Sequence, residues 1–246
     1  MRREKRKGYN RLSDKKPDRK SFIEWNEGMI RKYDPDQYHN HPSFLVRTVE
    51  AMRCRAVRKM CGESGERSVL DVGCGAGNLL KHFDGYDYVG IDISEYILEK
   101  AVSRKREGAC FVRGSVEALP FRDGSFPCVF SSEVIEHVLD PALMLSEMHR
   151  VLADGGVAVV SVPNEPLIDL IKSLVPGAGR SRDGYNAPKR MKDEWHLTEF
   201  SAAKFKTLAG EGFVIEKQVG IPSPVLPIRY VFKLRKRRGP GKRIDD

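Results

Sequence analysis

One loop of the sequence has residue types that let a small ligand lie against the backbone. Residues 68–72 form a short apolar run that predicts a buried strand, and Gly73, Gly75 and Gly77 follow it at once. Glycine allows the sharp turn after a strand and leaves room for a ligand beside the main chain. Asp92 ends the next apolar run, where a carboxylate can accept hydrogen bonds from both hydroxyls of a ribose. The pattern predicts a nucleoside-binding site.

The spacing of the glycines distinguishes two kinds of nucleoside ligand. A dinucleotide site usually has the pattern G-x-G-x-x-G, which brings a pyrophosphate to the start of a helix. Here the order is Gly73-x-Gly75-x-Gly77, and Asp71 precedes it. An acidic residue at that place suits a ligand that carries an ammonium group and no phosphate. We therefore expect a positively charged, unphosphorylated nucleoside; a tight turn without a ligand is the alternative.

Two histidines are candidates for catalysis. His137 follows Glu136 just beyond the fourth expected strand, and His196 immediately precedes an expected helix start at Thr198. Either could act as a general base for a poorly nucleophilic acceptor such as a hydroxyl or a carbon acid. The alternative for His137 is a local hydrogen bond at a helix start. The alternative for His196 is that it and Trp195 only anchor the chain.

The cysteines do not suggest metal or disulfide chemistry. They number five, lie scattered, and have no C-x-x-C spacing, which argues against a disulfide framework and against a zinc site. No segment approaches the roughly 20 apolar residues needed to span a bilayer. The basic amino terminus has no apolar segment behind it and is therefore not expected to be a secretory signal. We expect a cytoplasmic protein without a metal.

Strands and helices alternate through the middle of the chain. The expected strands are 68–72, 88–91, 110–112, 126–131, 157–162 and 213–215. The expected helices are 44–62, 78–83, 95–102, 141–154, 167–174 and 199–209. Ser94, Asp140 and Thr198 are the expected amino-terminal caps, and Gly155 with Gly156 is the expected end of one helix. This alternation predicts an α/β fold with a doubly wound, mostly parallel sheet covered on both faces.

The chain divides into four expected parts. They are a basic disordered tail over 1–20, a helical cap over 21–62, the α/β domain over 63–232, and a basic tail over 233–246. Within the domain, residues 163–197 interrupt the alternation and are expected to form a lid at the end of the sheet.

The net charge of +9 is concentrated at the two ends of the chain. Residues 1–20 carry a net +7 and residues 229–246 a net +6, which leaves −4 for the rest. Such tails could attract nucleic acid or anionic lipid. Neither tail interleaves aromatic residues with its charges, which favours solvated termini instead. The apolar residues before 233–238 could rest on a membrane surface, but a last strand of the sheet is the favoured interpretation.

Several segments resemble the motifs of class I S-adenosylmethionine-dependent methyltransferases, in particular the group that includes the ubiquinone and menaquinone biosynthesis methyltransferases. The similar segments are 69–77, 89–94, 114–121, 133–138, 150–156, 196–201 and 212–213. As a set these motifs are specific to the superfamily, but they say little about the methyl acceptor. The resemblance implies a Rossmann-like methyltransferase fold over 63–232 and S-adenosylmethionine as the cofactor.

The resemblance also implies which residues contact that cofactor. They are Gly73, Cys74, Gly75 and Gly77 along its methionine part, Asp71 at its amino group through water, Asp92 at the ribose, Ile93 and the backbone of Val116 at the adenine, and Glu133 at the border of the site. Ser115 stands where the family usually has an aspartate that accepts from the adenine amino group. A serine accepts that bond without a charge, so we expect affinity to be lower by about 1 kcal/mol.

Three functions remain open for the sequence. The first is methyl transfer to a small-molecule or lipid- or quinone-like acceptor, with the 163–197 insertion as one wall of the pocket. The second is methyl transfer to RNA or protein, guided by the basic tails; residues 131–134 read Ser-Ser-Glu-Val and lack an Asn-Pro-Pro-Tyr-type signature, which argues against it. The third is cofactor binding without catalysis, against which the intact Asp71, glycines and Asp92 argue. The oligomeric state is not predicted.

Overall fold

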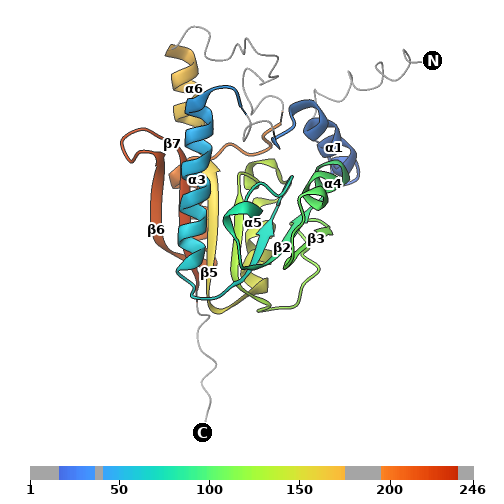
Figure 1. The fold of residues 1–246 in the computed structure, drawn as a ribbon. Coiled ribbons are helices and arrows are strands. Elements are labelled where there is room, and N and C mark those ends of the chain that lie inside the picture. The colour runs from blue at the N-terminus through green and yellow to red at the C-terminus, as the bar shows by residue number, and fades with distance from the viewer. Residues whose placement is uncertain (1–16, 37–40, 175–194, 238–246) are drawn as a thin grey trace, which may run out of the picture.

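A twisted β-sheet forms the centre of the computed structural model, which describes residues 17–36, 41–174 and 195–237 (Figure 1). Its strands are β1 (Ser68–Val72), β2 (Asp87–Asp92), β3 (Ala109–Arg113), β4 (Phe126–Ser132), β5 (Leu152–Pro163), β6 (Phe213–Pro222) and β7 (Pro227–Lys236). Their order in the sheet is β3-β2-β1-β4-β5-β7-β6. The first five strands pair in parallel, and β7 runs antiparallel to both β5 and β6. The expected doubly wound, mostly parallel sheet is therefore confirmed.

Helices cover both faces of this sheet. They are α1 (Phe22–Tyr33), α3 (Phe44–Gly62), α4 (Glu95–Ser103), α5 (Pro141–Val151), α6 (Glu165–Leu174) and α8 (Ala202–Ala209), with short 3-10 turns η2 (Leu80–His82) and η3 (Ile135–His137). Side chains alternate between the faces along each strand. In β4, Phe130 packs in the apolar cluster that contains Val57 of α3, and Val129 packs in the cluster that contains Met144 of α5 and Phe205 of α8. Both faces of the central strands are thus buried, as their apolar sequences predict.

Helix α3 buries one stripe of its surface, and that stripe is not wholly apolar. Val49, Val57 and Met60 face the core with almost no exposure. Glu50 and Arg53 lie on the same stripe near the start of the helix and are each 4% exposed. Charged side chains are rarely buried unless they are paired, so this end of α3 must supply each charge with a partner.

Two of the three expected caps are present. The Ser94 hydroxyl accepts a hydrogen bond from the backbone N–H of Ile97 at the start of α4. The Asp140 carboxylate accepts from the N–H groups of Ala142 and Leu143 at the start of α5. Both side chains satisfy backbone donors that have no partner within their own helix.

The third cap was predicted three residues too early. Helix α8 is capped by Ser201, whose hydroxyl accepts from the N–H of Lys204. Thr198 does not start the helix, because its N–H donates to the carbonyl of Glu136 and is held beside the end of β4. A contact with a distant part of the chain thus prevents Thr198 from capping the helix.

Two predicted helices are shorter in the structure. The expected helix over 78–83 is only the 3-10 turn η2, because the segment lies between Gly77 and Gly85, both with positive φ, and is too short to sustain an α-helix. The helix that was expected to stop at Gly155 ends at Val151 instead. Leu152 is already extended and pairs with Phe126 of β4, so the glycines lie within β5.

The carboxyl-terminal apolar segment is a strand of the sheet, as favoured. Strand β7 lies between β5 and β6 and continues to Lys236, so the basic tail predicted from residue 233 begins too early. Lys233 is paired with Glu63 at 2.7 Å, and Arg235 is paired with Glu216 at 2.7 Å. These basic side chains therefore belong to the folded body.

Some predictions concern residues outside the described part of the chain. Residues 1–16 and 238–246, which hold most of the two expected tails, are among them, as are residues 175–194 of the expected lid. Within the described ranges, no helix combines the length and the apolar character needed to cross a membrane.

Candidate functional site

A cavity of about 890 Å³ lies at the carboxyl ends of the parallel strands. Its walls come from the loop after β1, the ends of β2 and β4, and the segment after β3, together with α1, α3, α6 and the start of β7. Ligands of open α/β sheets bind at this edge of the sheet. The volume is near the upper end of the range for small-molecule sites, which leaves room for more than one nucleoside.

The glycine loop forms the floor of the cavity. The N–H groups of Gly73 and Cys74 both donate to the carbonyl of Ile91, at 2.8 and 3.0 Å, and this fixes the loop to β2. A Cβ on Gly73 would meet Val134 at 2.4 Å, so this position must be glycine for packing. Gly75 is different: its φ is 51°, and a Cβ there would meet only Ile97 at 4.0 Å. The space beside Gly75 belongs to the cavity.

Asp92 lies at the rim of the same loop and lines the cavity. One of its carboxylate oxygens accepts from the N–H of Gly75 at 2.9 Å, and the other accepts from the N–H of Ser94 at 3.0 Å. Burial raises the pKa of this carboxyl, and the hydrogen bonds from the backbone partly offset that effect. Each carboxylate oxygen can accept more than one hydrogen bond, so Asp92 can still accept from hydroxyl groups of a ligand.

Asp71 does not face the cavity. Its carboxyl is 1% exposed and lies beneath the loop, where the Tyr88 hydroxyl donates to it. Burial, opposed by this hydrogen bond, raises the pKa of Asp71 to about 7. Asp71 follows Val69 by two residues in β1, so its side chain projects from the same face of the sheet, where Val69 and Tyr88 pack in one apolar cluster. Asp71 does not line the cavity, and its action on a ligand's amino group through water stays a prediction.

Gly77 is also absent from the walls of the cavity. A Cβ at this residue would approach Phe111 at 3.3 Å and Ala101 at 3.5 Å. Its φ is 71°, in the left-handed region. Gly77 therefore serves the close packing of the loop against α4 and β3, and not the lining of the site.

The residues predicted to hold an adenine lie together at the other end of the loop. Ile93, Ser115 and Val116 all line the cavity. The N–H of Gly114 donates to the carbonyl of Asp92 at 2.9 Å, which joins the end of β3 to the end of β2. The Ser115 hydroxyl accepts from the N–H of Glu117 at 3.1 Å, and this closes a tight turn at that wall.

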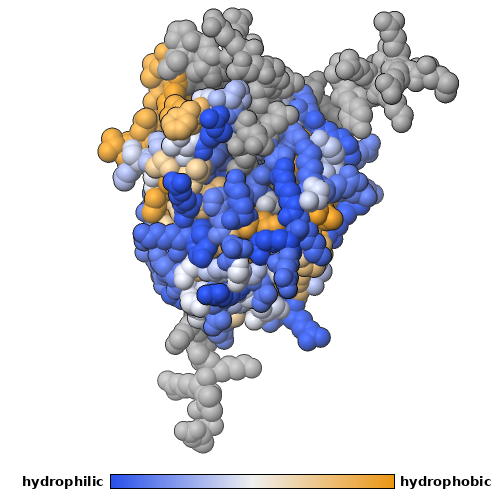
Figure 2. Space-filling model, in the orientation of Figure 1, coloured by the Kyte–Doolittle hydropathy of each residue, from blue (hydrophilic) through white to orange (hydrophobic). Residues whose placement is uncertain are grey.

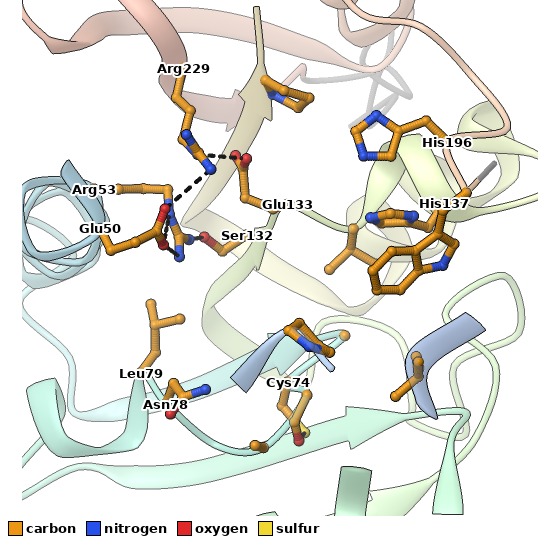
Figure 3. A pocket seen from close by; sticks show the side chains of 18 of the residues that line it. Glu50, Arg53, Cys74, Asn78, Leu79, Ser132, Glu133, His137, His196 and Arg229 are labelled. Atoms are coloured by element: carbon orange, nitrogen blue, oxygen red, sulfur yellow. Dashed lines mark hydrogen bonds and ion pairs between the residues drawn. The ribbon is translucent and has the colours of Figure 1, made fainter. Parts of the chain in front are cut away.

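An ion-pair network forms one wall of the cavity (Figure 3). The Glu133 carboxylate accepts from Arg229 at 2.9 Å and from Ser161 at 2.9 Å. Arg229 is also paired with Glu50 at 3.2 Å, and Glu50 is paired with Arg53 at 2.6 Å. Two carboxylates and two guanidinium groups together carry no net charge, so this wall is polar but neutral.

The network explains two local features. Burial acts to lower the pKa of Arg53, but Glu50 and the other neighbouring groups, Glu133 among them, together outweigh it and raise that pKa. Glu133 has a φ of 59°, a conformation that is unfavourable for a residue with a side chain. Its bonds to Arg229 and Ser161 hold it there. Of these residues, only Glu133 was predicted to belong to the site. Glu50 and Arg53 were missed; the sequence signal that could have found them is their position on the apolar stripe of a helix.

The two predicted catalytic histidines lie together on the opposite side of the cavity (Figure 3). Their ring centroids are 4.7 Å apart, and His137 also lies 4.4 Å from the ring of Trp195. The Nδ1 atom of His196 is hydrogen-bonded to the carboxylate of Glu165, whose other oxygen accepts from the N–H of Phe200 at 2.8 Å. Glu165 opens the expected amphipathic segment and was not singled out from the sequence.

The chain segment that carries His196 is tied to the end of β4. The N–H groups of Leu197 and Thr198 donate to the carbonyl of Glu136, at 2.8 and 3.1 Å. Burial, and second the charge of His196, hold the pKa of His137 well below its usual value. Burial, and second the charge of Glu133, raise the pKa of Glu136 well above its usual value.

The rim of the cavity carries exposed apolar side chains. They are Phe44 and Leu45 of α3, Leu170 and Leu174 of α6, and Val225 and Leu226 between β6 and β7. Figure 2 shows apolar surface gathered over α6 and beside it near the end of β6 and β7. Leu45 and Leu226 also line the cavity, as do Ile168 and Ile171 of α6. The cavity is thus apolar on the side away from the glycine loop.

Comparison with known proteins finds similarity to methyltransferases over part of the chain that forms this site. Residues 70–160 match the family described as "Methyltransferase domain". An uncharacterized methyltransferase of Mycolicibacterium gilvum is 39% identical over 132 residues, which are 52% of this chain and 51% of that protein. A malonyl-[acyl-carrier protein] O-methyltransferase of Erwinia billingiae is 32% identical over 116 residues, 43% of this chain and 45% of that protein. The chain thus spans about half the length of these curated relatives.

The fold also has close counterparts among solved structures. The N-methyltransferase NodS of Bradyrhizobium japonicum, solved with S-adenosyl-L-homocysteine, superimposes with a TM-score of 0.64. The match covers 86% of this chain and 98% of NodS, at 15% sequence identity. At that identity the likeness is one of fold.

Proposed function

We propose that the chain is an S-adenosylmethionine-dependent methyltransferase that methylates a small, lipid-like acceptor. Residues 70–160 match a methyltransferase domain, as the sequence motifs predicted. The observation that carries the proposal is the cradle at Gly75. Its backbone lies at the floor of the cavity, and the volume that a side chain would fill is left open.

The residues around the cradle fit S-adenosylmethionine. The Asp92 carboxylate at the edge of the loop is suited to accept from the two ribose hydroxyls. Ile93 and Val116 offer apolar contact for the adenine, and Ser115 offers an uncharged hydroxyl beside it. S-Adenosylmethionine carries no phosphate, so it needs no arginine or lysine beside the loop, and the residues of the loop that line the cavity are Gly73, Cys74, Gly75 and Ala76. These features support this cofactor over a dinucleotide.

The chemical role of the protein follows from that of the cofactor. S-Adenosylmethionine supplies a methyl group on a sulfonium, already activated for in-line displacement. The loop at Gly73 and Gly75 would fix the methionine part, and Asp92 would fix the ribose. The enclosing walls would exclude water and hold the acceptor in line, and such positioning accounts for a large part of the rate.

The acceptor would enter from the apolar side. Leu45, Ile168 and Leu226 form an apolar wall that continues onto the exposed rim, which suits an acceptor with an apolar tail. The polar end of such an acceptor would lie near His137 and His196. Glu165 engages Nδ1 of His196, which leaves Nε2 as the nitrogen available to a group in the cavity.

A methyl-transfer assay tests this proposal. Protein and S-adenosylmethionine with a labelled methyl group are incubated with long-chain phenols or quinols, with short-chain analogues that share the same polar end, with RNA, and with a protein extract. We expect label in the long-chain compounds, and a Leu226→Glu variant should lose rate on these by about tenfold or more while it keeps its rate on the short analogues. Leu174→Glu is the matched control, because Leu174 is exposed at the rim but does not line the cavity.

The same assay separates the competing acceptors. A chain truncated before residue 17 and after residue 237 lacks most of the basic termini but keeps every described element. We expect it to retain activity on the long-chain acceptors. Label found only in RNA or protein, and lost on truncation, would overturn the proposal in favour of a polymeric substrate.

A further inference from the structure

Three side chains with metal-binding atoms converge at the inner end of the cavity. Glu136 and His137 come from η3 at the end of β4, and His196 comes from the segment before α8. One potential ligand atom from each residue lies within 4.8 Å of the other two. Among the described residues, this is the one group of three or more such side chains that meets this distance.

The polar atoms of this group are poorly satisfied. Within the described chain, Oε2 of Glu136 and Nδ1 of His137 are buried and have no hydrogen-bond partner. The Glu136 side chain is 2% exposed and is shielded from bulk solvent. A buried polar atom without a partner costs about 1–3 kcal/mol. Neighbouring residues thus each carry an unpartnered buried atom, and the other carboxylate oxygen of Glu136 lies 4.0 Å from Nε2 of His137.

The charges around the cluster favour a cation. Glu165 is bonded to His196, and Glu133 lines the same cavity as His137 and His196, so three carboxyl groups lie around the cluster. Arg229 is paired with Glu133 at 2.9 Å and offsets one of them. A cation held by Glu136 and the two histidines would balance a further carboxylate.

The second layer of contacts has the form found at metal sites. Histidine ligands usually donate their other ring N–H to a carboxylate, which fixes the ring and the tautomer. Nδ1 of His196 is bonded to Glu165, and Glu165 is itself held by the N–H of Phe200 at 2.8 Å. Nδ1 of His196 is thereby engaged, and Nε2 is the nitrogen left to bind a metal.

We propose that Glu136, His137 and His196 bind one divalent cation, with Glu165 as the residue that positions His196. Two imidazoles and one carboxylate are the donor set of catalytic zinc sites and of other first-row transition metals. From the sequence we expected no metal, because the cysteines lack the spacing of a zinc site; the proposed site contains no thiolate and departs from that prediction. The ligand atoms lie within 4.8 Å of one another, whereas a tetrahedral ion with bonds of about 2.1 Å needs roughly 3.4 Å. Binding therefore requires the side chains to move inward by about 1 Å.

The location gives the ion a role. His137 and His196 line the cavity, whereas Glu136 lies behind them. Three protein ligands leave at least one coordination position, and that position faces the cavity. An oxygen of the acceptor can occupy it, release its proton to solvent, and then be aligned as an anion for the methyl group. The proposed cation therefore suits an acceptor that is methylated on an oxygen atom and that has a polar head and an apolar tail.

Direct metal binding tests the proposal without cofactor or substrate. Chelator-treated protein is titrated with Zn²⁺, Mn²⁺ and Mg²⁺ by calorimetry, and Co²⁺ is followed by its visible absorption. We expect about one Zn²⁺ per chain with a Kd below roughly 10 µM, and Co²⁺ bands typical of four or five ligands. Glu136→Gln and His196→Asn should each weaken Zn²⁺ binding by about 30-fold or more, and Glu165→Gln by about 10-fold.

A matched histidine outside the cluster provides the control. His149 lies on α5 against Phe213, with ring centroids 5.3 Å apart. We expect His149→Asn to bind Zn²⁺ like the wild type, and thermal unfolding checks that each variant is folded. If Glu136→Gln does not fold, the Co²⁺ spectrum of the wild type and Zn²⁺ binding by the His196→Asn variant still test the proposal. Less than half an equivalent of Zn²⁺ at about 100 µM, or equal weakening in His149→Asn, would overturn the proposal. Failure here would leave cofactor binding, which is measured separately, unaffected.

Discussion

The buried carboxyl of Asp71 should make the stability of the protein fall as the pH rises through neutrality. Its pKa is about 7 in the folded state, against 3.8 for the unperturbed group, because burial outweighs the hydrogen bond from Tyr88. The folded protein therefore binds this proton more tightly than the unfolded chain does. The stabilisation is complete below about pH 4 and is lost as the pH rises through 7.

The size of the effect follows from the two pKa values. Between pH 5 and pH 8 the unfolded carboxyl is ionised throughout, whereas the folded carboxyl loses its proton. At 1.36 kcal/mol for each unit of pKa, the free energy of unfolding should fall by about 2–3 kcal/mol over this range. Asp71→Asn carries no titratable proton and keeps an acceptor for the Tyr88 hydroxyl, so it should lack this part of the pH dependence.

Urea denaturation at pH 5, 6, 7 and 8 measures the effect. Other buried groups titrate as well, so the quantity that matters is the difference between wild type and Asp71→Asn at each pH. We expect the variant to gain about 2–3 kcal/mol relative to wild type between pH 5 and 8. Tyr88→Phe removes a hydrogen bond that favours the ionised form, and should extend the loss of stability to higher pH. Parallel curves for wild type and Asp71→Asn would refute the reasoning.

Three further predictions concern the cradle and the ion-pair wall. Gly75→Ala should weaken S-adenosylmethionine binding by about 30-fold or more, whereas Gly85→Ala, with a similarly positive φ of 72° far from the cavity, should cost stability and leave affinity unchanged; calorimetry showing equal affinities would contradict this. Ser115→Asp should tighten binding about three- to tenfold by restoring a charged acceptor, and weaker binding would argue against an adenine at that wall. Arg229→Met should lower the free energy of unfolding by about 1–3 kcal/mol, because it leaves the mostly buried Glu133 without its charged partner while Glu50 keeps Arg53. Arg235→Met, at an exposed pair, should cost less than about 1 kcal/mol, and urea denaturation compares the two.

Much of the fold could be predicted because its signals are local. The apolar runs that become β1 and β2, and the caps at Ser94 and Asp140, depend only on neighbouring residues. The turn of the glycine loop could also be predicted, because it depends only on the residue types within the loop. The cap at Thr198 was predicted wrongly because a distant carbonyl, that of Glu136, binds its N–H, and the helix before Gly155 was predicted too long because Leu152 pairs with Phe126 of β4.

The details of the site depend on contacts between distant parts of the chain. Arg229 and Glu133 are 96 positions apart in the sequence, and no local pattern predicts that they form a pair. His196 reaches His137 only because the segment that carries it is bonded to the end of β4. The orientation of Asp71 was also beyond the sequence, because its partner Tyr88 points toward it from the neighbouring strand.

The central claim, that the cavity holds S-adenosylmethionine at the glycine loop, is tested most directly by calorimetric titration of the cofactor into wild type and Asp92→Ala, with thermal unfolding as the check on folding. Asp92→Asn, whose single amide oxygen can accept from only one of the N–H groups of Gly75 and Ser94, is the isosteric companion. We predict one site with a Kd in the micromolar range for wild type, weakened by about 10–100-fold in Asp92→Ala through the loss of two charged hydrogen bonds to the ribose. Absence of binding to folded wild type at about 1 mM cofactor, or equal affinity in both proteins, would contradict the account.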